Sequence, residues 1–218
     1  MIAESLAGKR IAITGSTGFV GTALVERLLR GVPECELVLL IRSGKRTSAV
    51  DRLRREILKN DAFDRLREEM GGAKPFEEMA ARRIQVLEGD VSIDGLGLSE
   101  ADRAVLATCD IVIHSAAAVA FDSPLDKAIE INLMGPVRVA QTLQSVGSTA
   151  HLVAVSTCYV AGNRRGRAPE ELVSEGPFDI GISWKAEVAA ARRLRSDVEA
   201  QSREPDRLRG LRHDARRE

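Results

Sequence analysis

Five short apolar runs, rich in β-branched residues, alternate with stretches of helical periodicity along the chain. The runs cover residues 10–14, 36–41, 83–87, 110–114 and 151–156. Segments such as IAIT, LVLLI and IVIH are hydrophobic throughout, which is typical of strands covered by helices on both faces. Strands separated by helices form parallel sheets. The sequence therefore predicts an α/β fold, a Rossmann-like doubly wound parallel sheet with helices on both faces.

Charge and cysteine content exclude several classes of protein. The 218 residues include 32 Lys and Arg and 32 Asp and Glu, so a nucleic-acid binder that relies on net positive charge is excluded. Cys35, Cys109 and Cys158 form no CxxC pair, which argues against a zinc site and for a reducing compartment. No apolar stretch approaches the roughly 20 residues of a membrane-spanning helix. We expect a soluble, cytoplasmic protein without a membrane span or a metal site.

Two segments are unusually rich in charge. In residues 45–82, apolar residues at helical spacing predict an amphipathic cover in two helical pieces, split at Gly71, Gly72 and Pro75 and without a chemical role. Residues 184–218 carry ten Lys or Arg and seven Asp or Glu, a local net charge of 10 − 7 = +3. We expect a charged surface helix there, followed by a frayed tail that begins where Pro205 and Gly210 interrupt the pattern.

The segment TGSTGFVG directly follows the first predicted strand and precedes a helix. Gly15 permits a tight turn, Gly18 a close approach of backbone amides to a pyrophosphate, and Gly21 close packing of the helix. This context predicts a dinucleotide site; the alternative is a mere glycine-rich turn. The candidate cofactor-binding residues here are Thr14, Gly15, Thr17, Gly18, Phe19, Val20 and Gly21.

Arg42 stands at the end of the second predicted strand, where NAD-binding proteins carry an acidic residue for the ribose 2′-hydroxyl. A guanidinium pairs with a 2′-phosphate, which an Asp would repel. Arg42 therefore favours NADPH (NADP⁺) as the cofactor. The alternative is that its side chain only points to water.

Four motifs follow one another along the chain: TGSTGFVG at 14–21, GDVS at 89–92, IVIHSAAAVAFD at 111–122 and VSTCYVAG at 155–162. Together they resemble the extended short-chain dehydrogenase/reductase family over residues 8–163. The HSAA, FD, INLMG and STCYV segments resemble more narrowly the N-terminal NAD-binding domain of fatty acyl-CoA reductases and carrier-protein thioester reductases. The segment ISWKAEVAAARR resembles an insertion of bacterial acyl-CoA reductases.

The resemblance assigns further cofactor contacts. Asp90 would accept a hydrogen bond from the adenine amino group, and Val91 would pack beside the ring. Ser115, Ala116 and Ala117 would lie at the nicotinamide ribose, although a tightly packed turn explains the two alanines almost as well. A further candidate, Asn132, matches a helix asparagine near the site; the equal alternative is that it only holds backbone groups.

Ser156 and Thr157 match the position of the family's active-site hydroxyl, and Thr157 is the better match. Its hydroxyl would donate to the substrate carbonyl oxygen; the alternative is a strand end that satisfies backbone groups. The family also uses a Tyr-x-x-x-Lys pair. Here the single tyrosine, Tyr159, is followed four residues later by Asn163, and Lys185 is preceded four residues earlier by Gly181.

The resemblance thus implies NADPH-dependent reduction of a fatty acyl-CoA, or of a carrier-bound acyl thioester, to aldehyde or alcohol. We expect this chain to be a truncated, cofactor-binding portion with little activity of its own. Its expected parts are an incomplete NAD(P)-binding domain at 8–183 and a charged helical tail at 184–218. The alternatives are a non-catalytic NADP(H)-binding protein and a sugar-nucleotide epimerase or dehydratase of the extended family.

Overall fold

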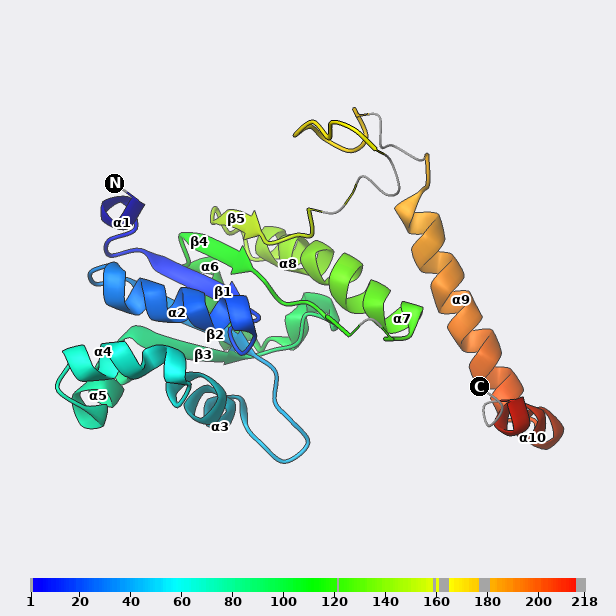
Figure 1. Ribbon diagram of the computed structural model, residues 1–218, viewed down its shortest axis with the longest axis horizontal. Helices are drawn as coiled ribbons and strands as arrows, with labels where there is room; N and C mark the ends of the chain where they lie inside the picture. Colours follow the sequence, from blue (N-terminus) through cyan, green and yellow to red (C-terminus); the bar gives the residue numbers. More distant parts are fainter. Residues whose placement is uncertain (1, 121, 159, 161–164, 177–180, 215–218) are drawn as a thin grey trace. The chain divides into compact units, whose positions relative to one another are not determined.

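The computed structural model describes the chain except residues 1, 121, 159, 161–164, 177–180 and 215–218. Its centre is a parallel sheet of five strands in the order β3-β2-β1-β4-β5 (Figure 1). The strands are β1 (Arg10–Thr14), β2 (Glu36–Ile41), β3 (Ile84–Glu88), β4 (Ile111–His114) and β5 (His151–Ala154). The predicted doubly wound α/β fold is therefore confirmed, with strand ends within two residues of those expected.

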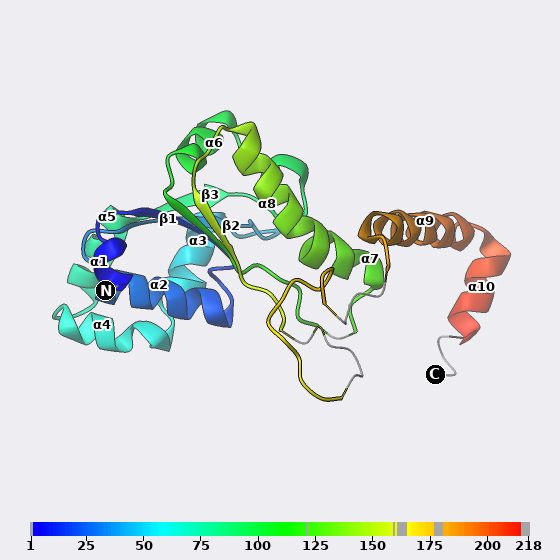
Figure 2. The ribbon, with the colours of Figure 1, turned by 90° about the horizontal axis from the view of Figure 1, so that it is seen from above.

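Alternate residues of the strands pack into two separate cores, one on each face of the sheet. Ile11 and Ile13 of β1 contribute to the first core, and Ala12, between them, contributes to the second. Each fully buried aliphatic side chain stabilises the fold by about 1.5–3 kcal/mol. The first core also holds buried residues of α2 (Phe19–Gly31), α3 (Ala49–Arg52), α4 (Asp64–Glu69) and α5 (Ala73–Arg83). The second holds residues of α6 (Glu100–Ala107) and α8 (Met134–Ser145) (Figure 2).

The charged segment after β2 covers the first face, as its amphipathic pattern predicts. The expected division into two pieces is wrong, because a further break occurs at Asn60. Its side chain accepts a hydrogen bond from the amide of Ala62 at 3.0 Å and caps a new helical turn. Pro75, expected at a break, lies inside the first turn of α5, where a missing amide is tolerated. The helical stretches are α3 with a π-helical extension at Leu53–Leu58, a 3-10 turn at Asp61–Phe63 with α4, and α5.

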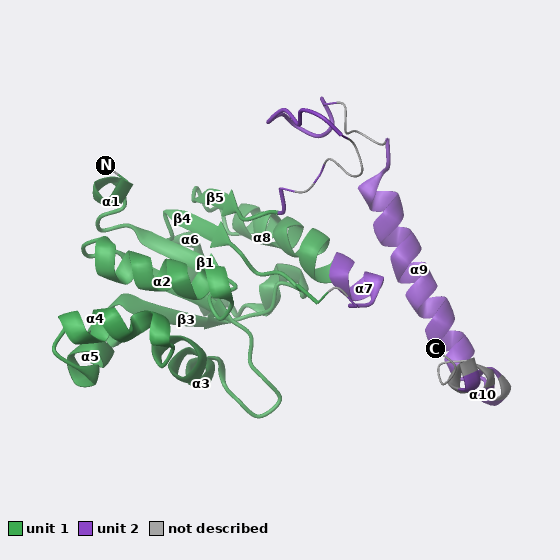
Figure 3. Ribbon diagram, in the orientation of Figure 1, with its two compact units in different colours: residues 1–120, 130–156 green, residues 121–129, 157–218 purple. Residues whose placement is uncertain are grey.

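The chain divides into two compact units (Figure 3). Unit 1 comprises residues 1–120 and 130–156 and contains the whole sheet, together with the short N-terminal helix α1 (Ile2–Ser5). Unit 2 comprises residues 121–129 and 157–218. The expected limit at residue 184 coincides with the start of a helix, whereas the units divide at residue 156.

Unit 2 contains α7 (Leu125–Ala128), α9 (Trp184–Ser202) and α10 (Pro205–Asp214). Arg195 of α9 bonds Glu199 one turn away at 2.6 Å and Asp126 of α7 at 3.3 Å. The frayed tail expected after α9 is wrong as far as Asp214, because Pro205 starts α10. None of the helices in the described part of the chain is long and apolar enough to cross a bilayer.

Candidate cofactor site

A pocket of about 320 Å³ lies at the carboxyl ends of β1 to β4 in unit 1. The chain order of the sheet reverses between β1 and β4, and open α/β sheets bind ligands at such a point. The pocket size falls within the range of small-molecule sites, about 300–1,000 Å³. It is lined by Gly15, Thr17, Gly18, Leu40, Ile41, Arg42, Arg52, Gly89, Asp90, Val91, Ser115, Ala116, Ala117, Ala118 and Ile131.

The turn after β1 has its shape because two glycines lack side chains. Gly15 has a φ of +75°, and a Cβ there would lie 2.6 Å from the amide nitrogen of Ala116. A Cβ on Gly21 would lie 2.2 Å from the carbonyl oxygen of Gly15. The start of α2 therefore packs directly against the turn, and β4's loop packs against it from the other side.

The N-terminus of α2 opens at this turn without a side-chain cap. Gly18 is the N-cap residue, and its amide donates to the carbonyl of Gly15 at 3.0 Å. The first amides of a helix have no intrahelical acceptor and attract anions. Phe19, Val20 and Gly21 supply those amides, although none of the three residues lines the pocket. Phe19 is 92% exposed.

Thr14 also lies outside the pocket lining, buried below the turn. Its hydroxyl is 2.8 Å from Nδ1 of His114 and accepts from the amide of Ala116 at 3.3 Å. Burial lowers the pKa of His114, so the ring is neutral at pH 7. This pair joins the ends of β1 and β4 under the pocket, and His114 is a buried, hydrogen-bonded residue.

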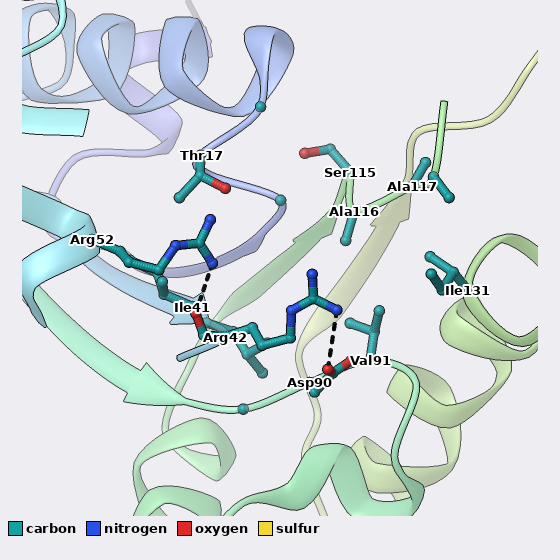
Figure 4. A pocket seen from close by; sticks show the side chains of 15 residues that line it. Thr17, Ile41, Arg42, Arg52, Asp90, Val91, Ser115, Ala116, Ala117 and Ile131 are labelled. Atoms are coloured by element: carbon teal, nitrogen blue, oxygen red, sulfur yellow. Dashed lines mark hydrogen bonds and ion pairs between the residues drawn. The ribbon is translucent and has the colours of Figure 1, made fainter. Parts of the chain in front are cut away.

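Two arginines extend into the pocket beside the end of β2 (Figure 4). Arg42, predicted from the sequence, has a side chain 63% exposed and lies 3.4 Å from a carboxylate oxygen of Asp90. Arg52 of α3 was not predicted. Its guanidinium bonds Glu56 at 2.7 and 2.8 Å and donates to the carbonyl of Arg42 at 2.6 Å. Residues 45–82 were expected to have no chemical role; within them, Arg52 nevertheless lines the pocket and adds a second positive charge to this wall.

Asp90 is held as an ionised acceptor in the loop after β3. One carboxylate oxygen accepts from the amide and the hydroxyl of Ser92 at 2.8 and 2.7 Å. Burial acts to raise the pKa of Asp90, but the hydrogen bonds from Ser92 and the charge of Arg42 together hold it below its ordinary value. Val91 is buried beside it and lines the pocket.

The loop after β4 forms the remaining wall with small residues, Ser115 to Ala118. Asn132, predicted near the cofactor, does not line the pocket. Its side chain accepts from the amide of Ala118 at 2.7 Å and donates to the carbonyl of the same residue at 2.9 Å. Asn132 thus holds backbone groups, as the alternative to a cofactor contact expected. Ile131 beside it lines the pocket, and no pattern in the sequence pointed to it.

The predicted catalytic hydroxyls follow β5. Ser156 is the last residue of unit 1 and Thr157 belongs to unit 2; both are exposed. Tyr159 and Asn163 lie outside the described residues. Leu40, Ile41 and Gly89 line the pocket without having been predicted, although each stands at the end of a predicted strand.

Comparison with known proteins identifies the family of the chain. The family model described as "Male sterility protein", a model of an NAD-binding family, matches residues 13–214. The chain belongs to this family. Its resemblance to the fatty acyl-CoA reductases and to extended short-chain dehydrogenases/reductases, stated from the motifs, is confirmed.

Fatty acyl-CoA reductases and a reductase domain are among the similar proteins. A putative fatty acyl-CoA reductase of Drosophila melanogaster, CG8306, is 39% identical over 163 residues, which are 73% of this chain and 30% of that protein. The chloroplastic fatty acyl-CoA reductase 2 of Arabidopsis thaliana is 34% identical over 83% of this chain and 28% of its own length. The reductase domain of a nonribosomal peptide synthetase from Mycobacterium tuberculosis is 31% identical, with a TM-score of 0.52 over 71% of this chain and 34% of its own. The chain therefore spans roughly a third of the length of such relatives.

Proposed function

We propose that the chain binds NADP(H) in the pocket of unit 1 and acts as the cofactor-binding part of a reductase of fatty acyl-CoA or of carrier-bound acyl thioesters. One observation carries the proposal. The turn after β1, Asp90 and two arginines line a single pocket at the point where the strand order reverses between β1 and β4. The relatives named as fatty acyl-CoA reductases support the substrate class.

The residues present fit a dinucleotide. The absent Cβ atoms of Gly15 and Gly18 and the uncapped amides of α2 provide space and donors for a pyrophosphate. The ionised carboxylate of Asp90 provides an acceptor for the adenine amino group. Ala116 and Ala117 leave room for a ribose along the loop after β4.

The preference for NADP(H) rests on Arg42 and Arg52. Both guanidinium groups extend toward the middle of the pocket, from the side where the β2 strand ends (Figure 4). Arg52 is anchored by Glu56, whereas among the described residues the exposed guanidinium of Arg42 has a single contact, at 3.4 Å with Asp90, and can turn toward a phosphate. Two such donors recognise a 2′-phosphate through charge-assisted hydrogen bonds.

For the reaction, a bound reduced dinucleotide supplies the hydride. We propose that the hydroxyl of Thr157 donates a hydrogen bond to the substrate carbonyl oxygen, where negative charge develops, and that Ser156 is the alternative donor. The chain's only tyrosine has Asn163 in place of the lysine that would lower its pKa. We therefore propose that this chain alone has little reductase activity.

The asparagine at position 163, where the family has a lysine, also favours a second candidate, a non-catalytic NADP(H)-binding protein. NADPH oxidation measured with palmitoyl-CoA tests what the two candidates share, the expectation of little or no turnover by this chain. Turnover at ordinary enzymatic rates, about 1–1,000 s⁻¹, refutes both the low-activity proposal and the non-catalytic candidate.

The cofactor preference is tested by titrating the chain with NADPH and NADH. We expect NADPH to bind at least about tenfold more tightly, a difference of about 1.4 kcal/mol. Arg42→Gln and Arg52→Gln should each weaken NADPH binding about tenfold and change NADH binding by less than about twofold, since one charge-assisted hydrogen bond contributes about 1.5–3 kcal/mol.

Arg65→Gln is the matched control. Arg65 forms the same kind of pair as Arg52, bonding Glu69 one helical turn away at 2.7 Å, but it does not line the pocket. Its replacement should leave both affinities unchanged. A dissociation constant for NADPH no lower than that for NADH contradicts the preference.

A further inference from the structure

Arg138 carries a buried positive charge beside the pocket. It lies on α8, its side chain is 6% exposed, and it is the one buried arginine among the described residues. Its Nε donates to Asp94 at 2.8 Å, and its two terminal nitrogens donate to the backbone carbonyl and the carboxylate of Glu130 at 2.9 and 2.5 Å. These hydrogen bonds join Arg138 to two segments, the turn Asp94–Gly97, against which α8 packs, and the turn that precedes α8.

The first of these segments is the loop after β3. Asp94 starts the 3-10 turn Asp94–Gly97, in which Leu96 has a φ of +61°, a conformation that costs a non-glycine residue energy. The amide of Asp90 donates to the carbonyl of Leu96 at 2.9 Å. The turn therefore determines where Asp90 and Val91 stand in the pocket wall.

The second segment is the π-helical turn Ile129–Leu133. π-helical turns in α-helices are rare and need support from their surroundings. Ile131 of this turn lines the pocket, and Asn132 holds both backbone groups of Ala118, another lining residue. Glu130, the partner of Arg138, directly precedes them.

One guanidinium thus connects the loop that carries Asp90 with the turn that carries Ile131 and Asn132. Apolar packing of similar volume often stabilises a fold as well as a buried ion pair does, so the contribution that distinguishes such a pair is the arrangement it specifies. We infer that Arg138 is a positioning residue that holds the loop of Asp90 and Val91, the adenosine side of the pocket, at a fixed spacing from the turn that carries Ile131. This inference rests on the proposed function, because it concerns the same cofactor site.

Arg138 does not line the pocket, so its replacement changes cofactor binding only through the two segments that it joins. We expect Arg138→Met to weaken binding of NADPH and of its fragment 2′,5′-ADP by the same factor, about tenfold. Equal factors are expected because the adenosine part is common to both ligands. Arg138→Lys retains the charge and one donating nitrogen and should recover part of the affinity for both ligands.

Arg30→Met provides the matched control. Arg30 forms a partly buried pair with Glu26 at 2.5 Å on α2, with side chains 20% and 12% exposed, and neither residue lines the pocket. This variant should lower the thermal stability and leave both dissociation constants within about twofold. Glu130→Gln, which keeps the size and the backbone carbonyl, serves as a second variant if Arg138→Met fails to fold, and it should weaken both ligands in parallel.

The outcomes are separable from those of the proposed function. Failure of the unaltered chain to bind NADPH and 2′,5′-ADP refutes the proposed function. If the unaltered chain binds and folded Arg138→Met or Glu130→Gln binds equally well, Arg138 has only a structural role. Unequal factors for the two ligands likewise overturn its assignment to the adenosine side.

Discussion

On the β1 side of the pocket the chain is shaped by missing side chains, whereas on the β3 side it is shaped by hydrogen bonds of charged side chains. Gly15 and Gly21 bring the turn, the loop after β4 and the start of α2 within contact distances that no Cβ tolerates. Across the pocket, Asp90 is fixed by Ser92 at one oxygen and approached by Arg42 at the other. Arg138 holds the segments behind it.

This difference predicts different responses to substitution. A side chain added to the glycine turn cannot be accommodated by a small local shift, because a backbone atom cannot move without displacing the strand that carries it. A wall built from charged hydrogen bonds loses affinity in steps, one donor or acceptor at a time. The turn after β1 should therefore tolerate almost no change, whereas the loop after β3 should permit altered selectivity.

The largest effect is expected for Gly21→Ala. The added Cβ would lie 2.2 Å from the carbonyl oxygen of Gly15, so the turn and α2 must separate. We expect the free energy of unfolding to fall by about 1–3 kcal/mol. NADPH binding should weaken by about 100-fold, equivalent to about 2.8 kcal/mol, as measured by titration of the folded fraction.

Gly31→Ala is its control at the other end of the same helix. The nearest atoms to an added Cβ belong to the side chain of Arg27, 3.7 Å away or more. Alanine is favoured over glycine in helices, so this variant should be more stable by up to about 1 kcal/mol and should bind NADPH normally. If Gly21→Ala and Gly31→Ala have the same stability and the same affinity for NADPH, the turn after β1 is not shaped by the absence of a Cβ at Gly21.

A smaller, selective effect is expected for Asp90→Asn. The amide can still accept from Ser92, but it loses the charged acceptor for the adenine amino group, and NADPH binding should weaken about tenfold, by about 1.4 kcal/mol. The hypoxanthine analogue of NADPH carries a carbonyl in place of that amino group, so the new amide donor should favour it. Titration with both ligands checks this.

Asp102→Asn is the matched substitution at an exposed helix start, where the carboxylate accepts from Ser99 at 2.8 Å. It should change neither affinity. If Asp90→Asn weakens the binding of NADPH and of its hypoxanthine analogue equally, Asp90 does not contact the edge of the adenine ring.

The β1 wall is predictable from the sequence because its determinants are local. Three glycines at fixed spacing, directly after an apolar strand, specify the turn and the helix that follows. Arg42 was found from its position at the end of a strand, and Asp90 was assigned by the family resemblance. Both lie in the pocket because the carboxyl ends of parallel strands meet at one edge of the sheet.

The rest of the site depends on contacts between distant residues. Arg52 reaches the pocket only because α3 starts after the cap at Ser48 and directs that side chain back to the carbonyl of Arg42. Arg138 and Asp94 are 44 residues apart, and no local pattern announces the π-helical turn between β4 and α8. The missed break at Asn60 and the misread Pro205 have a shared cause, because both residues start helical turns where we expected continuity or an end.

The most direct test of the central claim is a titration of the isotopically labelled chain with NADPH, followed by the amide chemical shifts. The account predicts saturable shifts concentrated in residues 15–21, 89–91 and 115–118, around the pocket at the strand ends. No saturable change, or shifts confined to the separate groove of about 680 Å³ between the π-helical segment Leu53–Leu58, α5 and β3, would contradict it.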